Sequence, residues 1–260
     1  MLITLTTDFG YQDPFVGVMK GVIFGINPHA DVIDLNHGIS PQDVMAAAIS
    51  LRHSVRYFPQ GTIHVAIVDP GVGGDRRPLL IESAGNYFIG PDNGVFSFAL
   101  EDQQPDRIIC LSDSKYHLQP TSMTFHGRDI FAPVAAHLSL GVPAKEFGES
   151  VESFRRLLWP KVVRQANCLK GEIVYVDGFG NLFTNIRRED LREFPSEKLS
   201  VTVGTIQISG LAPNYAAGTG AGYIALFNSW GFLEISLYKD NAQRRSQAKP
   251  GDKVDVWFNR

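Results

Sequence analysis

Three polar segments of the chain carry side chains that could act together on one ligand. Asp8 follows the short apolar run 2–6, a glycine-rich turn joins Asp69 to Arg76, and His126 directly precedes a helical pattern. A carboxylate placed like Asp8 can accept hydrogen bonds from the vicinal hydroxyls of a ribose, or it can cap a turn. Asp69 and Arg76 fit a structural ion pair, and a single histidine is commonly a satisfied polar group. A shared site therefore requires strands that deliver all three segments to one edge of a sheet.

Several kinds of catalytic chemistry lack the residues that they need. The segment 69–76 has neither the spacing of a dinucleotide fingerprint nor the Lys-Ser/Thr pair of a P-loop. The chain shows no Gly-X-Ser-X-Gly elbow, kinase signature or nucleophilic Cys–His arrangement, and its histidines lack zinc-ligand spacing. Cys110 and Cys168 stand without a partner motif. We therefore expect no covalent catalysis, no metal site and no cofactor.

Two segments in the second part of the chain could recognise a base. Asp177-Gly178-Phe179-Gly180-Asn181 is either a glycine hairpin or a loop in which Phe179 stacks on a base and Asn181 pairs with a purine edge. Asn228-Ser229-Trp230 precedes a glycine turn whose main chain could approach a ligand closely.

The composition limits the classes of partner. The chain has 260 residues, with 24 Lys and Arg against 27 Asp and Glu, and a formal net charge of -3. A slightly acidic protein is a poor non-specific binder of nucleic acid, which needs basic residues to neutralise phosphates. No apolar run reaches the roughly 18 residues of a membrane span, and the N-terminus lacks the basic start of a signal peptide. We expect a cytoplasmic protein that binds neither nucleic acid nor membrane.

Helical and strand patterns alternate in the first part of the chain, whereas short strand patterns fill the rest. Ser40-Pro41-Gln42-Asp43 predicts a helix with Ser40 as its N-cap and Pro41 in its first position, and another helix is predicted over 129–140, ending at Gly141. We predict an α/β domain with a mostly parallel central sheet between helices over residues 1–160, and an all-β antiparallel domain over 170–260. Strands are expected at 2–6, 32–35, 63–68, 79–82, 86–89 and 108–111, and then at 172–177, 199–203, 206–208, 223–227, 232–237 and 253–258.

Taken together, these motifs resemble those of the S-adenosyl-L-methionine (SAM) hydroxide adenosyltransferase family, the SAM hydrolases, which are related to SAM-dependent fluorinases and chlorinases. The resemblance spans nearly the whole chain. It rests on Thr-Asp-Phe-Gly at the start, Val-Asp-Pro-Gly-Val-Gly, Gly-Pro-Asp-Asn-Gly at 90–94, Thr-Phe-His-Gly-Arg-Asp-Ile-Phe-Ala-Pro at 124–133, Asp-Gly-Phe-Gly-Asn and Asn-Ser-Trp-Gly-Phe-Leu-Glu-Ile.

The resemblance implies hydrolysis of SAM to adenosine and L-methionine by attack of water at C5′. It implies that Asp69, Arg76 and His126 activate the water and that Asp8 holds the ribose hydroxyls. It also implies a homotrimer, with the ligand between the first domain of one subunit and the second domain of its neighbour. The other substrate-binding residues that it implies are Phe9, Gln42, Phe125 and Gly127 in the first domain, and Asp177, Phe179, Asn181, Tyr215, Asn228, Ser229 and Trp230 in the second.

The sequence departs from the halogenating relatives at the proposed reaction centre. The fluorinase carries a serine and a tyrosine at its halide site where this chain has Gly127 and Asp69, and a carboxylate would repel a halide. Gln42 aligns near a fluorinase tryptophan on the ribose side, and Trp230 replaces the arginine that follows the Asn-Ser pair. A SAM-dependent halogenase and a non-catalytic adenosine- or SAM-binding protein remain the alternatives.

Overall fold

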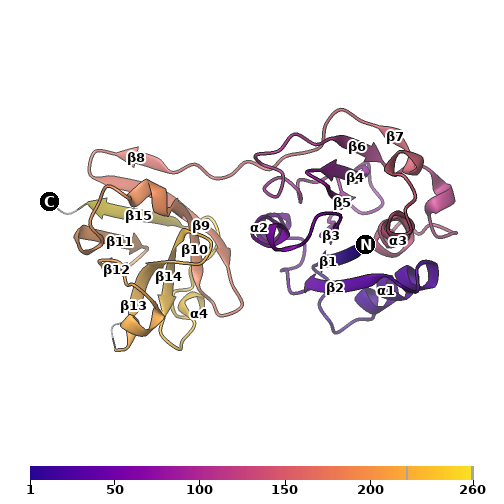
Figure 1. Ribbon diagram of the computed structural model, residues 1–260. Helices are drawn as coiled ribbons and strands as arrows, with labels where there is room; N and C mark the ends of the chain where they lie inside the picture. The colour runs from indigo at the N-terminus through magenta and orange to yellow at the C-terminus, as the bar shows by residue number, and fades with distance from the viewer. Residues whose placement is uncertain (221, 259–260) are drawn as a thin grey trace. The chain divides into compact units, whose positions relative to one another are not determined.

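The computed structural model describes residues 1–220 and 222–258, which form two compact units, Met1–Leu158 and Trp159–Arg260 (Figure 1). We call them unit 1 and unit 2 and describe each by itself. No helix in the described part of the chain is long and apolar enough to cross a bilayer.

Unit 1 is built around a mixed seven-stranded sheet in the order β2-β1-β3-β5-β4-β6-β7. Its strands are β1 (Leu2–Thr7), β2 (Asp31–Asn36), β3 (Ile63–Ile67), β4 (Pro78–Ser83), β5 (Asn86–Pro91), β6 (Arg107–Cys110) and β7 (Glu149–Ser150). Parallel pairing joins β2, β1, β3 and β5, whereas β4, β6 and β7 pair antiparallel.

The prediction of a mostly parallel sheet is therefore only partly right. A parallel connection needs a long crossover, but β4 and β5 are joined by the two residues Ala84 and Gly85. Both have positive φ, 49° and 76°, as a tight hairpin turn requires. This hairpin reverses the chain, and the half of the sheet beyond β5 is antiparallel as a result.

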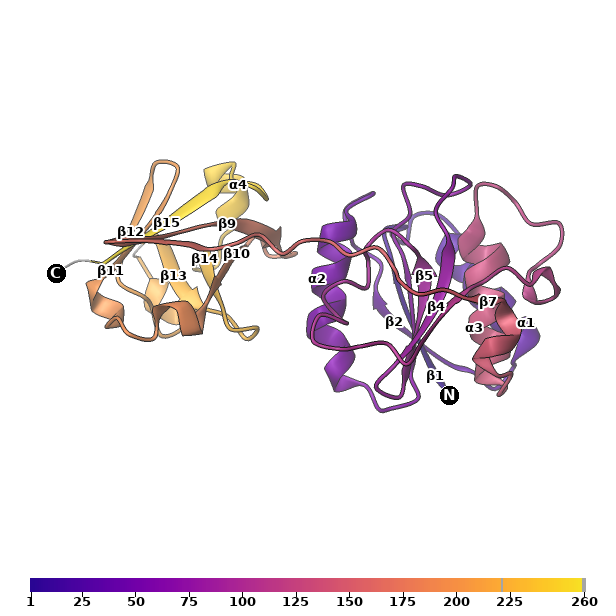
Figure 2. The same ribbon diagram turned by 90° about the horizontal axis from the view of Figure 1, so that it is seen from above.

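Helices cover both faces of this sheet. Figure 2 shows α2 (Val44–Ser54) on one face, with α1 (Phe15–Ile26) and α3 (Ala132–Ser139) on the other. Ile3, Leu5 and Ile63 are fully buried between the layers. Short 3₁₀ turns lie at Val55–Tyr57, Ser114–Tyr116 and Ala144–Phe147, and a π-helical turn at Gly127–Phe131 precedes α3.

The predicted start of α2 is wrong. Asp43, not Ser40, is the N-cap, because its side chain accepts a hydrogen bond from the main-chain N–H of Ala46. Gln42 has a φ of 67°, which a helical residue cannot adopt. The helix therefore begins at Val44. The predicted end of α3 is confirmed, since Gly141 follows it with a φ of 92°.

Unit 2 is an antiparallel sheet that curls toward a barrel, because its end strands β12 and β13 are in contact. Leu182, Leu233 and Val256 lie in its core. Its strands are β8 (Val163–Gln165), β9 (Cys168–Val176), β10 (Leu182–Arg187), β11 (Leu199–Val203), β12 (Ile206–Ser209), β13 (Tyr223–Phe227), β14 (Phe232–Leu237) and β15 (Lys253–Phe258). The helix α4 (Ala242–Ser246) and 3₁₀ turns at Arg188–Leu191, Ser196–Lys198 and Tyr215–Gly218 complete it. The expectation of an antiparallel β fold in the second part is confirmed.

Candidate active site

The ends of two neighbouring parallel strands carry the predicted acidic residues of unit 1. β1 pairs with β3 so that Thr7 lies opposite Ile67. Asp8 follows β1 directly, and Asp69 follows β3 by two residues. Both carboxylates therefore leave the sheet at its carboxyl edge, where open α/β sheets bind their ligands.

Arg76 joins Asp69 and His126 in one hydrogen-bonded cluster. Its Nε lies 3.1 and 3.0 Å from the two carboxylate oxygens of Asp69, and its Nη2 lies 2.6 Å from Oδ2. The same Nη2 lies 2.7 Å from Nδ1 of His126. The side chains of Asp69 and Arg76 are only 6% and 9% exposed. The structure therefore brings together the three residues that the sequence singled out.

The contact with Arg76 decides which nitrogen of His126 carries the proton. A guanidinium can only donate hydrogen bonds, so Nδ1 of His126 must accept. The neutral ring then carries its proton on Nε2 and presents an N–H there. Burial lowers the pKa of His126 below its ordinary value, and the nearby positive charge of Arg76 lowers it further. The neutral ring is favoured for both reasons.

Two close contacts hold the cluster together. Gly73, in the turn between Asp69 and Arg76, has a φ of 75°, and a Cβ on it would lie 2.2 Å from the carbonyl oxygen of Met123. The turn is thus packed against the segment that leads to His126. Behind the guanidinium, the ring of Phe131 lies 5.5 Å from Cζ of Arg76. Phe131 ends the π-helical turn, a feature frequent at functional sites.

The remaining predicted residues of unit 1 surround Asp8 and His126. The main-chain N–H of Gln42 donates to Oδ2 of Asp8 at 2.7 Å. The rings of Phe9 and Phe125 meet edge to face at 5.9 Å. Gly127 begins the π-helical turn, where a Cβ would lie 3.2 Å from the ring of Phe125. Gln42 thus reaches Asp8 through its backbone, a contact that its residue type does not predict.

Unit 2 contains a cavity of about 900 Å³ that collects all the residues predicted there. Its wall includes Asp177, Phe179, Asn181, Tyr215, Asn228, Ser229 and Trp230. Asp177 shapes one side of it, since its Oδ1 accepts the main-chain N–H groups of Phe179 and Asn181, both at 2.9 Å. Phe179 is 80% exposed, which leaves its ring free to stack on a flat ligand. Trp230 packs on the ring of Phe183 at 5.0 Å.

Glu234 lines the same cavity and was not predicted as a site residue. It is fully buried in β14, and its Oε1 accepts hydrogen bonds from Tyr215 at 2.9 Å and from Ser236 at 2.5 Å. Burial raises the pKa of the Glu234 carboxyl, although these hydrogen bonds partly offset the effect. The signal in the sequence was an acid inside the apolar run 232–237, a position that a strand buries.

No cluster of three or more His, Cys, Asp or Glu side chains in the described ranges is arranged to hold a metal ion. The predicted residues instead form two groups, an Asp–Arg–His cluster at the same sheet edge as Asp8 in unit 1 and a cavity with an aromatic wall in unit 2.

Comparisons with known proteins identify the same family in both units. Residues 3–148 match the model of the SAM hydroxide adenosyltransferase N-terminal domain, and residues 171–255 match that of the C-terminal domain. An (R)-S-adenosyl-L-methionine hydrolase of Methanocaldococcus jannaschii is 34% identical over 99% of this chain and 96% of its own length. A protein of the same name from Thermus thermophilus is 35% identical over 94% and 95%. A crystal structure of an uncharacterized conserved protein from Thermotoga maritima superposes with a TM-score of 0.88 at 33% identity, covering 99% of this chain and all of that one. The chain therefore belongs to the SAM hydroxide adenosyltransferase family.

Proposed function

We propose that the protein hydrolyses S-adenosyl-L-methionine to adenosine and L-methionine. The observation that carries this proposal is the hydrogen-bonded Asp69–Arg76–His126 cluster, at the same sheet edge as Asp8, in a chain of this family. Water attacks C5′, the C5′–O bond forms, and the C5′–S bond breaks. The bonding electron pair stays on sulfur as a neutral thioether, and one proton is released.

The substrate explains why so few groups are needed. The sulfonium of SAM carries its own leaving group, so the reaction requires neither a general acid nor a cofactor. It requires an oxygen nucleophile held in line with the C5′–S bond. A cluster that fixes a single water molecule satisfies this need.

The tautomer of His126 assigns the roles within the cluster. Because its free nitrogen Nε2 carries a proton, His126 donates a hydrogen bond to the water oxygen instead of taking its proton. Asp69 is then the proton acceptor, and Arg76 holds it in place through three contacts. One lone pair of the water is engaged by His126 and the other stays directed at C5′.

The halogenase alternative is disfavoured by the carboxylate of Asp69. A halide held against this carboxylate would be repelled, although Arg76 offsets part of the negative charge. A binding protein without catalysis is the remaining alternative, in which Asp69 and Arg76 form only an ion pair.

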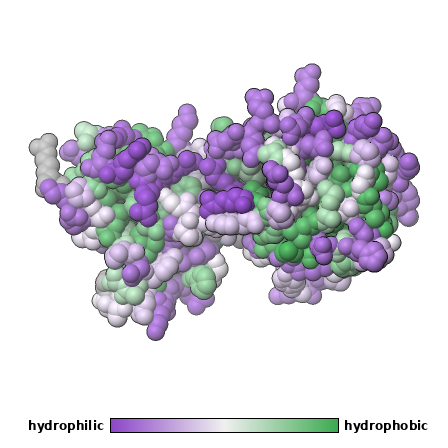
Figure 3. All heavy atoms as spheres, in the orientation of Figure 1, coloured by the Kyte–Doolittle hydropathy of each residue, from purple (hydrophilic) through white to green (hydrophobic). Residues whose placement is uncertain are grey.

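Substrate recognition is divided between the two groups of residues. In our proposal Asp8 accepts hydrogen bonds from the ribose hydroxyls, while the cavity of unit 2 holds adenine and methionine. We also propose a homotrimer in which the ligand contacts unit 1 of one subunit and unit 2 of a neighbouring subunit. Large apolar side chains exposed on unit 1, including Phe15 and Phe24 of α1 and Ile33 of β2, support such an assembly. Part of the face of unit 1 seen in Figure 3 is apolar.

The experiment is incubation of the purified protein with SAM in H₂¹⁸O, followed by mass spectrometry of the products. We expect adenosine with one ¹⁸O at C5′, L-methionine without label, and no 5′-halogenated nucleoside even at high chloride. Absence of adenosine would leave the binding-protein alternative standing.

Variants test the cluster itself. Asp69→Asn should lower turnover by about 10²–10⁴-fold while leaving adenosine affinity nearly unchanged, because the proton acceptor is lost. Asp75→Asn removes an exposed carboxylate from the same turn and is the matched control. Equal turnover in the two variants would disprove the assignment of Asp69.

A further inference from the structure

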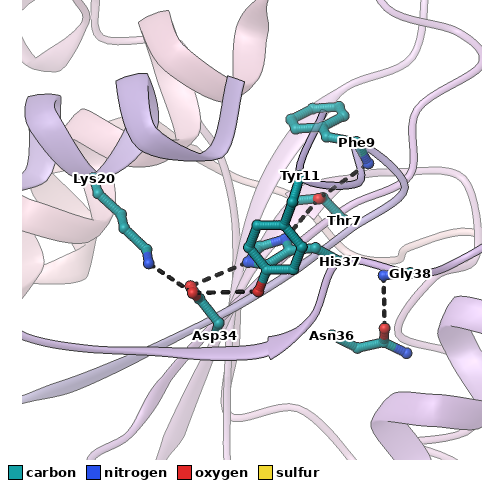
Figure 4. Close-up of polar contacts among 8 residues, drawn as sticks. All are labelled: Thr7, Phe9, Tyr11, Lys20, Asp34, Asn36, His37 and Gly38. Atoms are coloured by element: carbon teal, nitrogen blue, oxygen red, sulfur yellow. Dashed lines mark hydrogen bonds and ion pairs between the residues drawn. The ribbon is translucent and has the colours of Figure 1, made fainter. Parts of the chain in front are cut away.

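A series of polar contacts links β2 to the loop that carries Asp8, and the proposed reaction does not use these contacts. Figure 4 shows His37 between Asp34 and Thr7, with Lys20 and Tyr11 also directed at Asp34. His37 is buried, with Nε2 3.1 Å from Oδ1 of Asp34 and Nδ1 2.8 Å from Oγ1 of Thr7. Nζ of Lys20 lies 2.6 Å from Oδ2 of Asp34, and the hydroxyl of Tyr11 lies 3.4 Å from it.

The ionised carboxylate of Asp34 sets the direction of the hydrogen bonds in this series of polar contacts. Burial alone would raise the pKa of Asp34, but hydrogen bonds from Lys20 and His37 outweigh it, so that the pKa is lowered and the carboxylate accepts. Nε2 of His37 then donates to Asp34, and in the neutral ring its Nδ1 accepts the hydroxyl proton of Thr7. The Thr7 oxygen is left to accept the main-chain N–H of Phe9 at 3.2 Å.

These contacts end on both sides of Asp8. Thr7 and Phe9 are its neighbours in the chain, and the Thr7 side chain bonds the Phe9 backbone across it. One residue further on, the N–H of Gly10 donates to the carbonyl of His37 at 2.9 Å. The backbone that carries the Asp8 carboxylate is therefore clamped to His37.

We propose that His37, acting through Thr7, is a positioning residue that aims Asp8 at the ribose hydroxyls. This inference rests on the ribose-binding role of Asp8 in the proposed function. His37 itself touches neither the water nor the substrate. Its effect lies in the affinity for the nucleoside and not in the rate of the chemical step.

Thr7→Val tests the proposal by removing the hydroxyl without changing the shape of the side chain. We expect the Kd for adenosine and the KM for SAM to rise about tenfold, as two hydrogen bonds are lost, with kcat unchanged. Thr7→Ser keeps the hydroxyl and should restore both values. Thr6→Val is the matched control, because Thr6 is also buried in β1 and its hydroxyl has no hydrogen-bond partner among the residues that the structure describes.

A double-mutant cycle separates positioning from a general structural role. In an Asp8→Ala background, Thr7→Val should cause no further loss of adenosine affinity, because the residue that it positions is gone. A similar loss of adenosine affinity in both backgrounds would overturn the proposal. If the wild-type protein hydrolyses SAM, equal adenosine affinities of the Thr7→Val and Thr6→Val variants would also overturn it. A wild type that forms no adenosine from SAM would instead refute the proposed function.

A pair of variants at His37 covers the case in which Thr7→Val does not fold. The side-chain oxygen of Asn can replace Nδ1 and keep the contact with Thr7, whereas the amide of Gln reaches the place of Nε2 and keeps the contact with Asp34. His37→Asn should therefore bind adenosine more tightly than His37→Gln. The reverse order would overturn the proposal.

Discussion

Gly73→Ala should disable the proposed reaction centre without touching any of its side chains. Gly73 has a φ of 75°, and a Cβ built on it would lie 2.2 Å from the carbonyl oxygen of Met123. Met123 precedes His126 by three residues, and Gly73 lies in the turn between Asp69 and Arg76. The added methyl group therefore pushes apart the two segments that the cluster joins.

The structure sets the size of the effect. A carbon and an oxygen that are not bonded rest at a little over 3 Å, so the segments must separate by about 1 Å. Misplacement of catalytic groups by about 1 Å can cost about 10²-fold in rate. The positive φ adds about 1 kcal/mol of destabilisation, because a side chain is disfavoured there. We expect kcat to fall about 100-fold and the free energy of unfolding to fall by at least this backbone contribution.

Gly61→Ala is the control for the backbone contribution. Gly61 has a φ of 83°, and a Cβ on it would meet no atom of the described residues within 4 Å. Adenosine release from SAM, measured by chromatography, and urea unfolding would be compared in the two variants. Both should lose stability, but only Gly73→Ala should lose turnover. If the kcat of Gly73→Ala equals that of Gly61→Ala, the close contact between Gly73 and Met123 does not position the cluster.

Two further predictions concern acid stability and the cavity of unit 2. Burial lowers the pKa of His64 to about 4, from an ordinary value of 6.5. Between pH 6.5 and pH 4, the unfolded chain therefore binds a proton at His64 that the folded protein does not bind. About 2 kcal/mol of stability should be lost by pH 5 as a result. Urea unfolding from pH 7 to 5 should show this slope, and His64→Gln should flatten it; an unchanged slope would contradict the prediction. Gly180 has a φ of 85°, and a Cβ there would lie 2.2 Å from the side chain of Asn241, which lines the cavity and is held as the N-cap of α4 by the main-chain N–H of Arg244. Gly180→Ala should therefore displace this part of the cavity wall and weaken adenosine binding about tenfold, as measured by calorimetric titration. Gly204 has a φ of 55° and open space around it, so Gly204→Ala is the control and should bind adenosine with wild-type affinity in a calorimetric titration. Equal adenosine affinities of Gly180→Ala and Gly204→Ala would count against the prediction.

Local pattern was sufficient to place four of the eight described β strands in unit 2 with their observed bounds. The predicted ranges 199–203, 223–227, 232–237 and 253–258 are those of β11, β13, β14 and β15. Alternation of apolar and polar residues reports which face of a strand is buried, and turns mark its ends. This information lies within a few residues of sequence, so no distant contact was needed to find these elements.

Local pattern was misleading where a distant contact overrides it. Ser40-Pro41 has the form of a helix start, yet the backbone of Gln42 turns to positive φ and donates to Asp8. The direction of β4 was missed for a different reason, which lies in the adjacent turn and not in a distant contact. Strand patterns are alike in parallel and antiparallel pairs, and only the short turn at Ala84 and Gly85 reverses the chain.

The sequence by itself determined the chemical inventory of this protein: carboxylates after strands, an arginine close behind one of them, a histidine before a helix, and aromatic and amide side chains in glycine turns. Only the tertiary structure decided how they meet. Arg76 and His126 are 50 positions apart and share a hydrogen bond because β3 and the segment before α3 reach the same edge of the sheet. That contact also decides the proton position on His126, and hence which residue can accept a proton. A pairing between distant side chains and the charge state that it imposes are properties of the folded chain, because neither is encoded within any short segment.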